Sequence, residues 1–122
     1  MSHEIIRAIA ESRGDAALVT IIDVKGSVPR HTGSKMLVRK AGGILGTVGG
    51  GKGEALAAEK AKECIAKMRS ETLTIEMRGT EAEGTAMICG GTSRMLVEFV
   101  DDVSPYRIAL ARLGMGERVL LI

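Results

Sequence analysis

Aromatic side chains are almost absent from this 122-residue chain, which has one phenylalanine, Phe99, one tyrosine, Tyr106, and no tryptophan. Proteins that bind single-stranded nucleic acid usually stack the bases on aromatic rings. The shortage therefore argues against a nucleic-acid partner. Aliphatic residues and the seven methionines, whose side chains adapt to irregular gaps, must fill the core instead.

Cysteine and histidine are also scarce, with two of each. Two cysteines do not form a disulfide framework, so we expect Cys64 and Cys89 to be reduced thiols. Neither His3 nor His31 is spaced with a cysteine as zinc ligands are. The sequence therefore predicts no zinc site.

Long apolar runs are missing as well. None approaches the roughly 20 residues of a membrane-spanning helix, and residues 1–4 do not begin a secretory signal. We therefore expect no membrane span and a cytoplasmic location. The length suits a single domain over residues 1–122, without a second, dinucleotide-binding domain.

Acidic residues are missing between Val24 and Gly53, although this stretch carries six of the 17 Lys and Arg residues. The rest of the chain has a net charge of −4. A basic segment within a mildly acidic chain favours an anionic ligand, with a solvated basic face as the alternative. The six cations are Lys25, Arg30, Lys35, Arg39, Lys40 and Lys52.

Hydrophobic periodicity predicts an α/β or α+β fold, with a mixed sheet of about five to six strands flanked by about three helices. The first strand is an uninterrupted apolar run, which is typical of burial on both faces. The last strand is expected to lie inside the sheet or to pair with a second copy in a homodimer. The predicted helices are 3–13 (ending near Gly14), 54–69 and 104–114 (capped by Ser104), and the predicted strands are 16–24, 34–40, 44–48, 72–77, 94–100 and 118–122.

A glycine-rich loop joins the third predicted strand to the second helix. A strand, a glycine loop and a helix N-terminus together aim backbone N–H groups at a phosphate. Glycine permits close approach of the ligand and a positive φ. The segment therefore predicts a pocket for a phosphate-bearing anion, with a tight turn that binds nothing as the alternative. Its glycines are Gly46, Gly49, Gly50, Gly51 and Gly53.

Two nucleotide-binding motifs are nearly matched by this loop. Residues 46–52 fit the first seven positions of a P-loop, but the eighth is Gly53, which has no hydroxyl for magnesium. The dinucleotide fingerprint fails because Glu54 stands where its third glycine belongs. Nucleotide hydrolysis and dinucleotide binding are both disfavoured.

Two side chains near these segments, Glu54 and Cys89, admit two interpretations, whereas Cys64 admits one. Glu54 either complements the helix dipole or faces a metal, a ring N–H donor or a cation such as Lys35 or Arg30. Cys64 lies on the apolar stripe of the helix and is expected in the core. Cys89 precedes two glycines, whose N–H groups can lower a thiol pKa, so a reactive thiol and inert packing both remain open.

Three segments in order resemble the N-terminal domain of the XdhC/CoxI family, the accessory factors of xanthine dehydrogenase and related molybdenum hydroxylases. The first is Gly26–Met36 (GSVPRHTGSKM), similar to the family's G-S-x-P-R-x-x-G-[AS]-[KR]-M. The second is Gly46–Glu54 (GTVGGGKGE), similar to G-[ST]-[IV]-[SG]-G-G-x-x-E. The third is Cys89–Gly91, similar to the family's C-G-G. The resemblance covers roughly residues 15 to 100.

This resemblance implies binding of molybdenum cofactor, with a molybdenum hydroxylase and a cysteine desulfurase as partners. It implies that Cys89 faces the metal or a transferred sulfur, and it leaves Glu54 as a second candidate for a reactive role. It also implies that phosphate or oxo groups contact Ser27, Arg30 and Lys35. The remaining cofactor-binding residues would be glycines that allow close approach: Gly26, Gly33, Gly49, Gly50, Gly51, Gly90 and Gly91.

Two functions follow from these observations. The first is a cofactor-binding chaperone that assists sulfuration and insertion of the cofactor. The second is an enzyme, either a sulfurtransferase that uses Cys89 or a nucleotide- or phosphate-handling activity of the glycine loop. In either case we expect Cys89 and the loops 26–35 and 49–54 to converge on one cleft.

Overall fold

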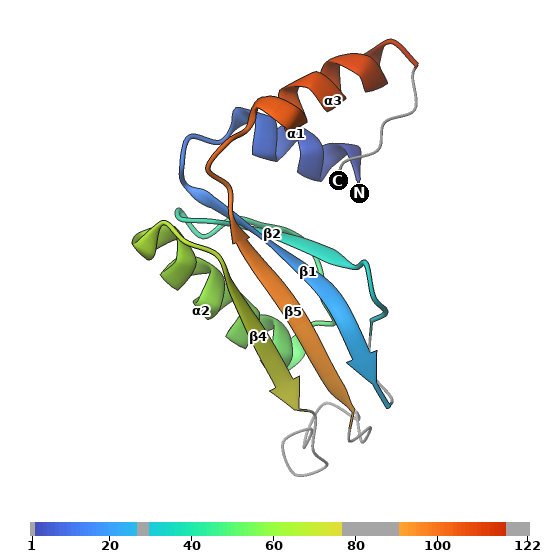
Figure 1. The fold of residues 1–122 in the computed structure, drawn as a ribbon, viewed down its shortest axis with the longest axis vertical. Coiled ribbons are helices and arrows are strands. Elements are labelled where there is room, and N and C mark those ends of the chain that lie inside the picture. Colours follow the sequence, from blue (N-terminus) through green and yellow to red (C-terminus); the bar gives the residue numbers. More distant parts are fainter. Residues whose placement is uncertain (1, 27–29, 77–90, 117–122) are drawn as a thin grey trace.

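The computed structural model describes residues 2–26, 30–76 and 91–116, which form five strands and three helices (Figure 1). The α/β fold and the expected number of elements are confirmed. The residues of the predicted strand 118–122 lie outside the described part of the chain. The elements are α1 (His3–Glu11), β1 (Ala16–Lys25), β2 (Lys35–Arg39), β3 (Ile44–Gly46), α2 (Gly51–Lys67), β4 (Glu71–Glu76), β5 (Thr92–Phe99) and α3 (Ser104–Gly114).

The strands form one sheet in the order β3-β2-β1-β5-β4, with β1 at its centre. The four pairings are all antiparallel, so the expectation of a mixed sheet is wrong for the strands described. The prediction failed because a strand, a helix and a strand in succession, as in β3, α2 and β4, are typical of two parallel neighbouring strands. Strands β3 and β4 do run in the same direction, but they lie at opposite edges with three strands between them.

Strand β1 is buried on both faces along its first six residues, as its apolar run predicts. Ala17, Val19 and Ile21 pack in the larger cluster, which also contains residues of α2. Ala16 and Leu18 point the other way and pack with residues of α1. Helix α2 therefore covers one face of the sheet, while α1, with α3 packed on it, covers part of the other.

The helix boundaries differ from the predicted ones by a few residues. Helix α1 begins after Ser2, whose hydroxyl oxygen accepts the N–H of Ile5 at 3.2 Å, and it is capped at its other end by Ser12 rather than Gly14. Helix α2 starts three residues earlier than predicted, at Gly51. Helix α3 has Val103 at its N-cap, so that Ser104 becomes its first helical residue.

Within the described ranges, none of the helices is both long and apolar enough to cross a membrane.

Candidate functional site

The two glycine-bearing segments that the sequence singled out leave the sheet at the same end (Figure 1). The first joins β1 to β2, and the second joins β3 to α2. They approach each other directly, because Met36 pairs with Gly46 and a Cβ placed on Gly46 would lie 2.5 Å from the backbone oxygen of Lys35. The antiparallel register therefore brings residues about ten positions apart in sequence into contact.

The segment between β1 and β2 folds back on β1. The N–H of Gly33 donates to the carbonyl of Ile21 at 2.8 Å, and Gly26 and Gly33 have positive φ values of 72° and 96°. The Lys35 ammonium donates to the Thr20 hydroxyl at 3.2 Å on the sheet face opposite α2. Arg30 is exposed. This segment thus presents two cationic side chains, one tethered to the sheet and one projecting into solvent.

The glycine loop itself is organised by the carboxylate of Glu54. The Oε1 atom accepts the N–H groups of Val48 and Gly50, each at 3.2 Å, and also the hydroxyl of Thr47. The Thr47 hydroxyl oxygen in turn accepts the N–H of Gly49 at 3.1 Å. The backbone N–H groups of residues 48, 49 and 50 therefore all donate to groups within the loop.

Three successive glycines give the loop its shape. Gly49, Gly50 and Gly51 have φ values of 128°, 73° and 62°, which side chains other than glycine rarely adopt. The predicted need for positive φ in this loop is confirmed. Whether these three glycines contact a cofactor stays a prediction.

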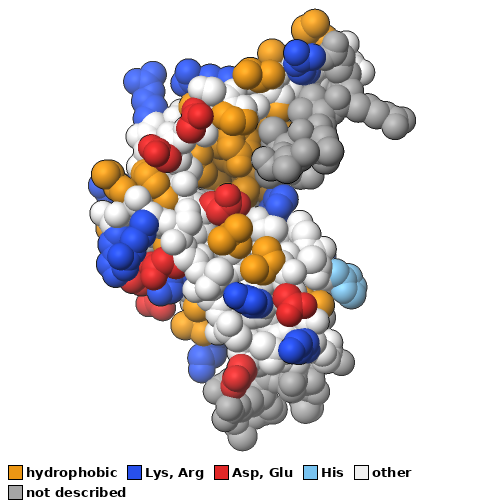
Figure 2. Space-filling model, in the orientation of Figure 1, with side chains coloured by type: hydrophobic (Ala, Val, Ile, Leu, Met, Phe, Trp, Pro, Cys, Tyr) orange, Lys and Arg blue, Asp and Glu red, His pale blue; other side chains and the backbone are white. Residues whose placement is uncertain are grey.

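The basic stretch between residues 24 and 53 is divided between the two ends of the sheet. Lys25 and Lys35 lie at the end that carries the glycine loops, whereas Arg39 and Lys40 lie at the other end, where the Lys40 N–H donates to the carbonyl of Asp15. Figure 2 shows Lys and Arg side chains of the whole described chain spread over the visible face rather than gathered in one patch. The charge pattern overstated the cationic character of the site.

A shallow surface cleft lies at the end away from the loops. It is lined by Ala8, Glu11, Ser12, Asp15 and Arg39. Two of its side chains are acidic, and none belongs to the three motifs. We therefore do not regard it as the cofactor site.

The third motif reaches the described part of the chain only at Gly91. This residue is buried and precedes β5, whose first residue, Thr92, pairs with Lys25 at the loop end of the sheet. The other predicted site residues of this motif, Cys89 and Gly90, lie outside the described residues, as does Ser27. The predicted convergence of Cys89 on the two loops is therefore still a prediction.

Ser93 is a candidate that the sequence analysis missed. Its hydroxyl is buried, with the residue 6% exposed, and it has no hydrogen-bond partner among the residues described. A buried hydroxyl without a partner costs about 1–3 kcal/mol, so a polar ligand atom there would be favourable. The signal was available in the sequence: Ser93 occupies an inward-facing position in register with Met95 and Val97, two residues after Gly91.

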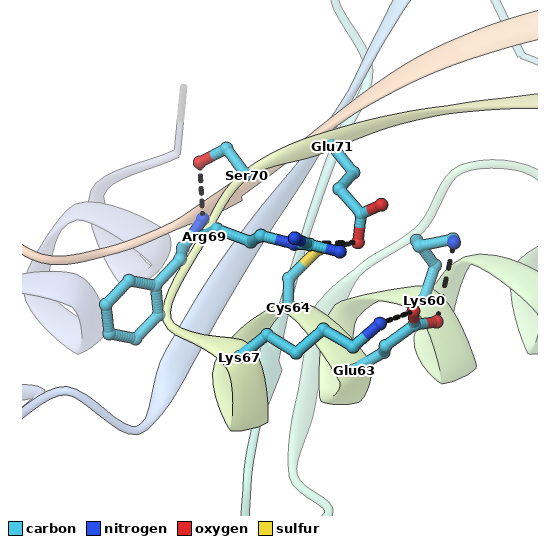
Figure 3. A network of polar contacts seen from close by, with 8 residues as sticks. Lys60, Glu63, Cys64, Lys67, Arg69, Ser70 and Glu71 are labelled. Carbon is cyan, nitrogen blue, oxygen red and sulfur yellow. Dashed lines mark hydrogen bonds and ion pairs between the residues drawn. The ribbon is translucent and has the colours of Figure 1, made fainter.

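Cys64 lies in the core, as expected, at the other end of α2 from the glycine loop (Figure 3). Its thiol lies 3.8 Å from a Glu71 carboxylate oxygen, and the same oxygen is 3.9 Å from the guanidinium of Arg69. Burial and, second, the charge of Glu71 raise the pKa of the Cys64 thiol. A thiol that is hard to ionise is a poor nucleophile, so Cys64 has a packing role.

In the described ranges, no group of three His, Cys, Asp or Glu residues is arranged to hold a metal ion. The polar groups at the loop end are instead suited to an anionic organic ligand. They include the cations Arg30 and Lys35. The unpartnered hydroxyl of Ser93 lies at the same end of the sheet but on the face that α2 covers, opposite the Lys35 side chain. Cationic donors such as Arg30 and Lys35 suit a phosphate better than a bare metal ion.

Comparisons with known proteins identify relatives of the chain. Residues 9–76 match the XdhC and CoxI family. The chain is 31% identical over 100 residues to the uncharacterized protein YqeB of Escherichia coli K12, covering 82% of the chain and 18% of that protein. It is 30% identical over 114 residues to the molybdenum cofactor insertion chaperone PaoD of the same organism, covering 93% of the chain and 35% of PaoD.

A solved structure has the same fold. The crystal structure of a xanthine dehydrogenase from Bacillus halodurans superposes with a TM-score of 0.74 at 28% sequence identity, over 95% of this chain and 35% of that one. The chain thus spans about a third or less of the length of the relatives it matches.

Proposed function

Because the chain belongs to the XdhC and CoxI family, we propose that it binds molybdenum cofactor and assists its insertion into a molybdenum hydroxylase of the xanthine dehydrogenase type. The observation that carries the proposal is the meeting of the family's first two motifs at one end of the sheet, with Gly46 against Lys35. PaoD, a relative over nearly the whole chain, is a molybdenum cofactor insertion chaperone.

The residues of the first motif would hold the phosphate of the cofactor. Arg30 and Lys35 supply positive charge, and Ser27 adds a hydroxyl. Gly26 and Gly33, with positive φ, keep the backbone free of side chains there. Contacts between ionised donors and phosphate are about twice as strong as neutral hydrogen bonds. Lys35 is already held by Thr20, which reduces the side-chain entropy lost on binding.

The third motif would serve the metal end of the cofactor. When bound, the cofactor supplies a molybdenum centre held by a pterin dithiolene. In our proposal Cys89 faces the metal or a sulfur delivered by a cysteine desulfurase, while Gly90 and Gly91 permit close approach. The handover to the hydroxylase would take place in the cytoplasm. A homodimer paired through residues 118–122 also remains a proposal.

Nucleotide hydrolysis is less favoured than cofactor binding. A phosphate-binding loop needs free backbone N–H groups, and those of Val48 and Gly50 donate to Glu54 here. The residue after Lys52 is also a glycine without a hydroxyl. No observation in the described residues favours this second function.

The proposal is tested by anaerobic titration of the protein with cofactor released from a molybdoenzyme, with Kd as the measured quantity. We expect Arg30→Ala to weaken binding about 10- to 100-fold, because a charge-assisted contact to phosphate contributes on the order of 1.5–3 kcal/mol. Arg39→Ala is the matched control, since Arg39 belongs to the same basic stretch but lies at the other end of the sheet. Its affinity should equal that of the wild type.

Cys89→Ser provides a second arm of this experiment. It should leave the far-ultraviolet circular dichroism unchanged but reduce the molybdenum retained after gel filtration. If the wild type does not bind the cofactor at tens of micromolar (about 6 to 7 kcal/mol of affinity), or if Arg39→Ala weakens binding as much as Arg30→Ala, the proposed function or its site is wrong.

A further inference from the structure

The glycine loop has the form of an anion cradle, but an anion of the protein already occupies it. Three donors converge on a single atom, Oε1 of Glu54: the hydroxyl of Thr47 and the N–H groups of Val48 and Gly50. Among the described residues none of the hydrogen bonds of Glu54 reaches its other oxygen, Oε2. The carboxylate thus accepts all three of these hydrogen bonds through one oxygen.

The position of Glu54 explains how it can do this. Helix α2 begins at Gly51, so Glu54 is its fourth residue, and its side chain reaches back over the first turn to the N–H of the N-cap residue, Gly50. No side chain caps the helix at Gly50 itself. The arrangement resembles the glutamate half of a capping box, with a carboxylate that neutralises the positive end of the helix dipole.

A phosphate would have to compete with this carboxylate. It would need the same N–H donors, and it would approach a fixed negative charge only a few ångströms away. Two like charges this close repel each other even in bulk water, and more strongly near a protein surface. The loop therefore disfavours the ligand group that its glycine-rich sequence suggests.

We propose that Glu54 is a positioning and specificity residue: a built-in carboxylate that fills the anion cradle of the glycine loop and excludes phosphate from the N–H groups of Val48 and Gly50. The phosphate of the ligand then goes to the cations of the segment between β1 and β2. Glu54 Oε2 leaves an acceptor on the loop, which suits N–H donors of a heterocycle. The inference rests on the proposed function only for the identity of the ligand.

The experiment reads the two amides directly in the full-length, ¹⁵N-labelled protein, with inorganic phosphate and formate as probes. In the wild type, neither probe should shift the Val48 and Gly50 amide resonances at tens of millimolar. In Glu54→Ala both resonances should move, and formate should titrate them back toward their wild-type positions, since a small carboxylate replaces the missing one. We expect a dissociation constant on the order of 10 mM, as befits a weak, untethered ligand.

Two further variants keep the test decisive. Glu59→Ala removes the same charge from an exposed position on the same helix and should leave both amides unchanged. Glu54→Gln retains the shape but not the charge, so it answers the question even if Glu54→Ala does not fold. Its Val48 and Gly50 amides should exchange with solvent about tenfold faster than in the wild type, because neutral hydrogen bonds are weaker.

Phosphate shifts of the Val48 and Gly50 amides in the wild type would overturn the proposal. So would a Glu54→Ala protein that folds but does not respond to formate, or unchanged amide exchange in Glu54→Gln. None of these measurements uses molybdenum cofactor. A wild type that fails to bind the cofactor yet behaves as described here would therefore refute the proposed function and leave the role of Glu54 intact.

Discussion

Helix α2 begins and ends in different ways. At its N-terminus three glycines with positive φ precede the first full turn, and Glu54 gathers the donors of the loop. At its C-terminus the chain turns through Met68, a residue with a side chain, at φ 54°. Near this second end, Lys60 and Lys67 form ion pairs with Glu63 (Figure 3).

The difference separates an end closed by one strained residue from an end built of glycines. At the C-terminus the helix accepts the strain of one left-handed residue, and its carbonyls at Cys64 and Ile65 are satisfied by the N–H of Met68. At the N-terminus three successive residues turn with positive φ, and all three are glycine. This end therefore meets its backbone geometry through residue choice, whereas the C-terminal end does not.

The strongest test of this comparison asks whether the loop before α2 needs glycine to avoid a steric clash as well as to adopt a positive φ. In Gly46→Ala the new Cβ would lie 2.5 Å from the backbone oxygen of Lys35, at a φ of 80°. We expect the free energy of unfolding, measured by urea denaturation, to fall by about 3 kcal/mol, from left-handed strain and overpacking together.

Two other glycines calibrate this effect. Gly50→Ala meets nothing within 4 Å and should lose only the strain of its φ of 73° and ψ of −175°, about 1–3 kcal/mol. Gly43→Ala makes an ordinary 3.6 Å contact with the Arg39 side chain and should change stability by less than about 0.5 kcal/mol. A Gly46→Ala protein as stable as Gly43→Ala would show that the approach to Lys35 is not tight.

The sequence predicted most of the fold because the local patterns are strong. The apolar run of β1 and the helical stripe of α2 locate the central strand and the helix that covers it. What the sequence could not predict is which strands are neighbours. Helix α2 connects β3 at one edge of the sheet to β4 at the other edge. How many strands such a connection crosses depends on long-range packing, which local patterns do not show. The antiparallel pairing of β1 with β5 was therefore missed.

The site was predicted less completely than the fold. The motif positions meet at one end of the sheet because antiparallel strands bring alternate connections together. Charge spacing along the chain, however, does not show that Arg39 lies a full strand length from Arg30. Nor could it show that Glu54 turns back into its own loop, since a side-chain direction depends on the helix start. Cys89 lies outside the described residues, and its role stays a prediction.

The buried thiol at the C-terminal end of α2 makes stability depend on pH. Burial raises the pKa of Cys64 in the folded state, so its ordinary value near 9.0 applies to the unfolded chain. Above about pH 9 the unfolded state loses this proton first, and stability falls with a slope of up to about 1.4 kcal/mol per pH unit. Below that pH the thiol is protonated in both states and contributes no pH dependence.

Cys64→Ala isolates this effect from the other groups that titrate at alkaline pH, including Tyr106, whose pKa is also raised by burial. The variant loses some core packing, so the comparison concerns slopes and not absolute stability. We expect the unfolding free energies of wild type and variant to run parallel up to about pH 8 and to converge above it. Curves that stay parallel to pH 10 would mean that Cys64 ionises as easily in the folded protein as in the unfolded chain.

The smallest effect is expected at the C-terminal end of α2, where Met68 occupies a left-handed position that is usually glycine. Met68 has φ 54° and ψ 44°, and the residue is 69% exposed, so glycine there would relieve left-handed strain and lose little contact. We expect Met68→Gly to raise the free energy of unfolding by up to about 1 kcal/mol, after the added entropy of the unfolded chain is subtracted. This corresponds to a Tm increase of about 4 °C, measurable by thermal denaturation.

Met115→Gly is the matched control, because Met115 also follows a helix and is 73% exposed, but has φ −95°. It should lose a few tenths of a kcal/mol. If both variants lose stability equally, Met68 carries no strain. The residue at the C-terminal end of α2 would then suit its backbone conformation as well as the glycines suit theirs at the N-terminal end.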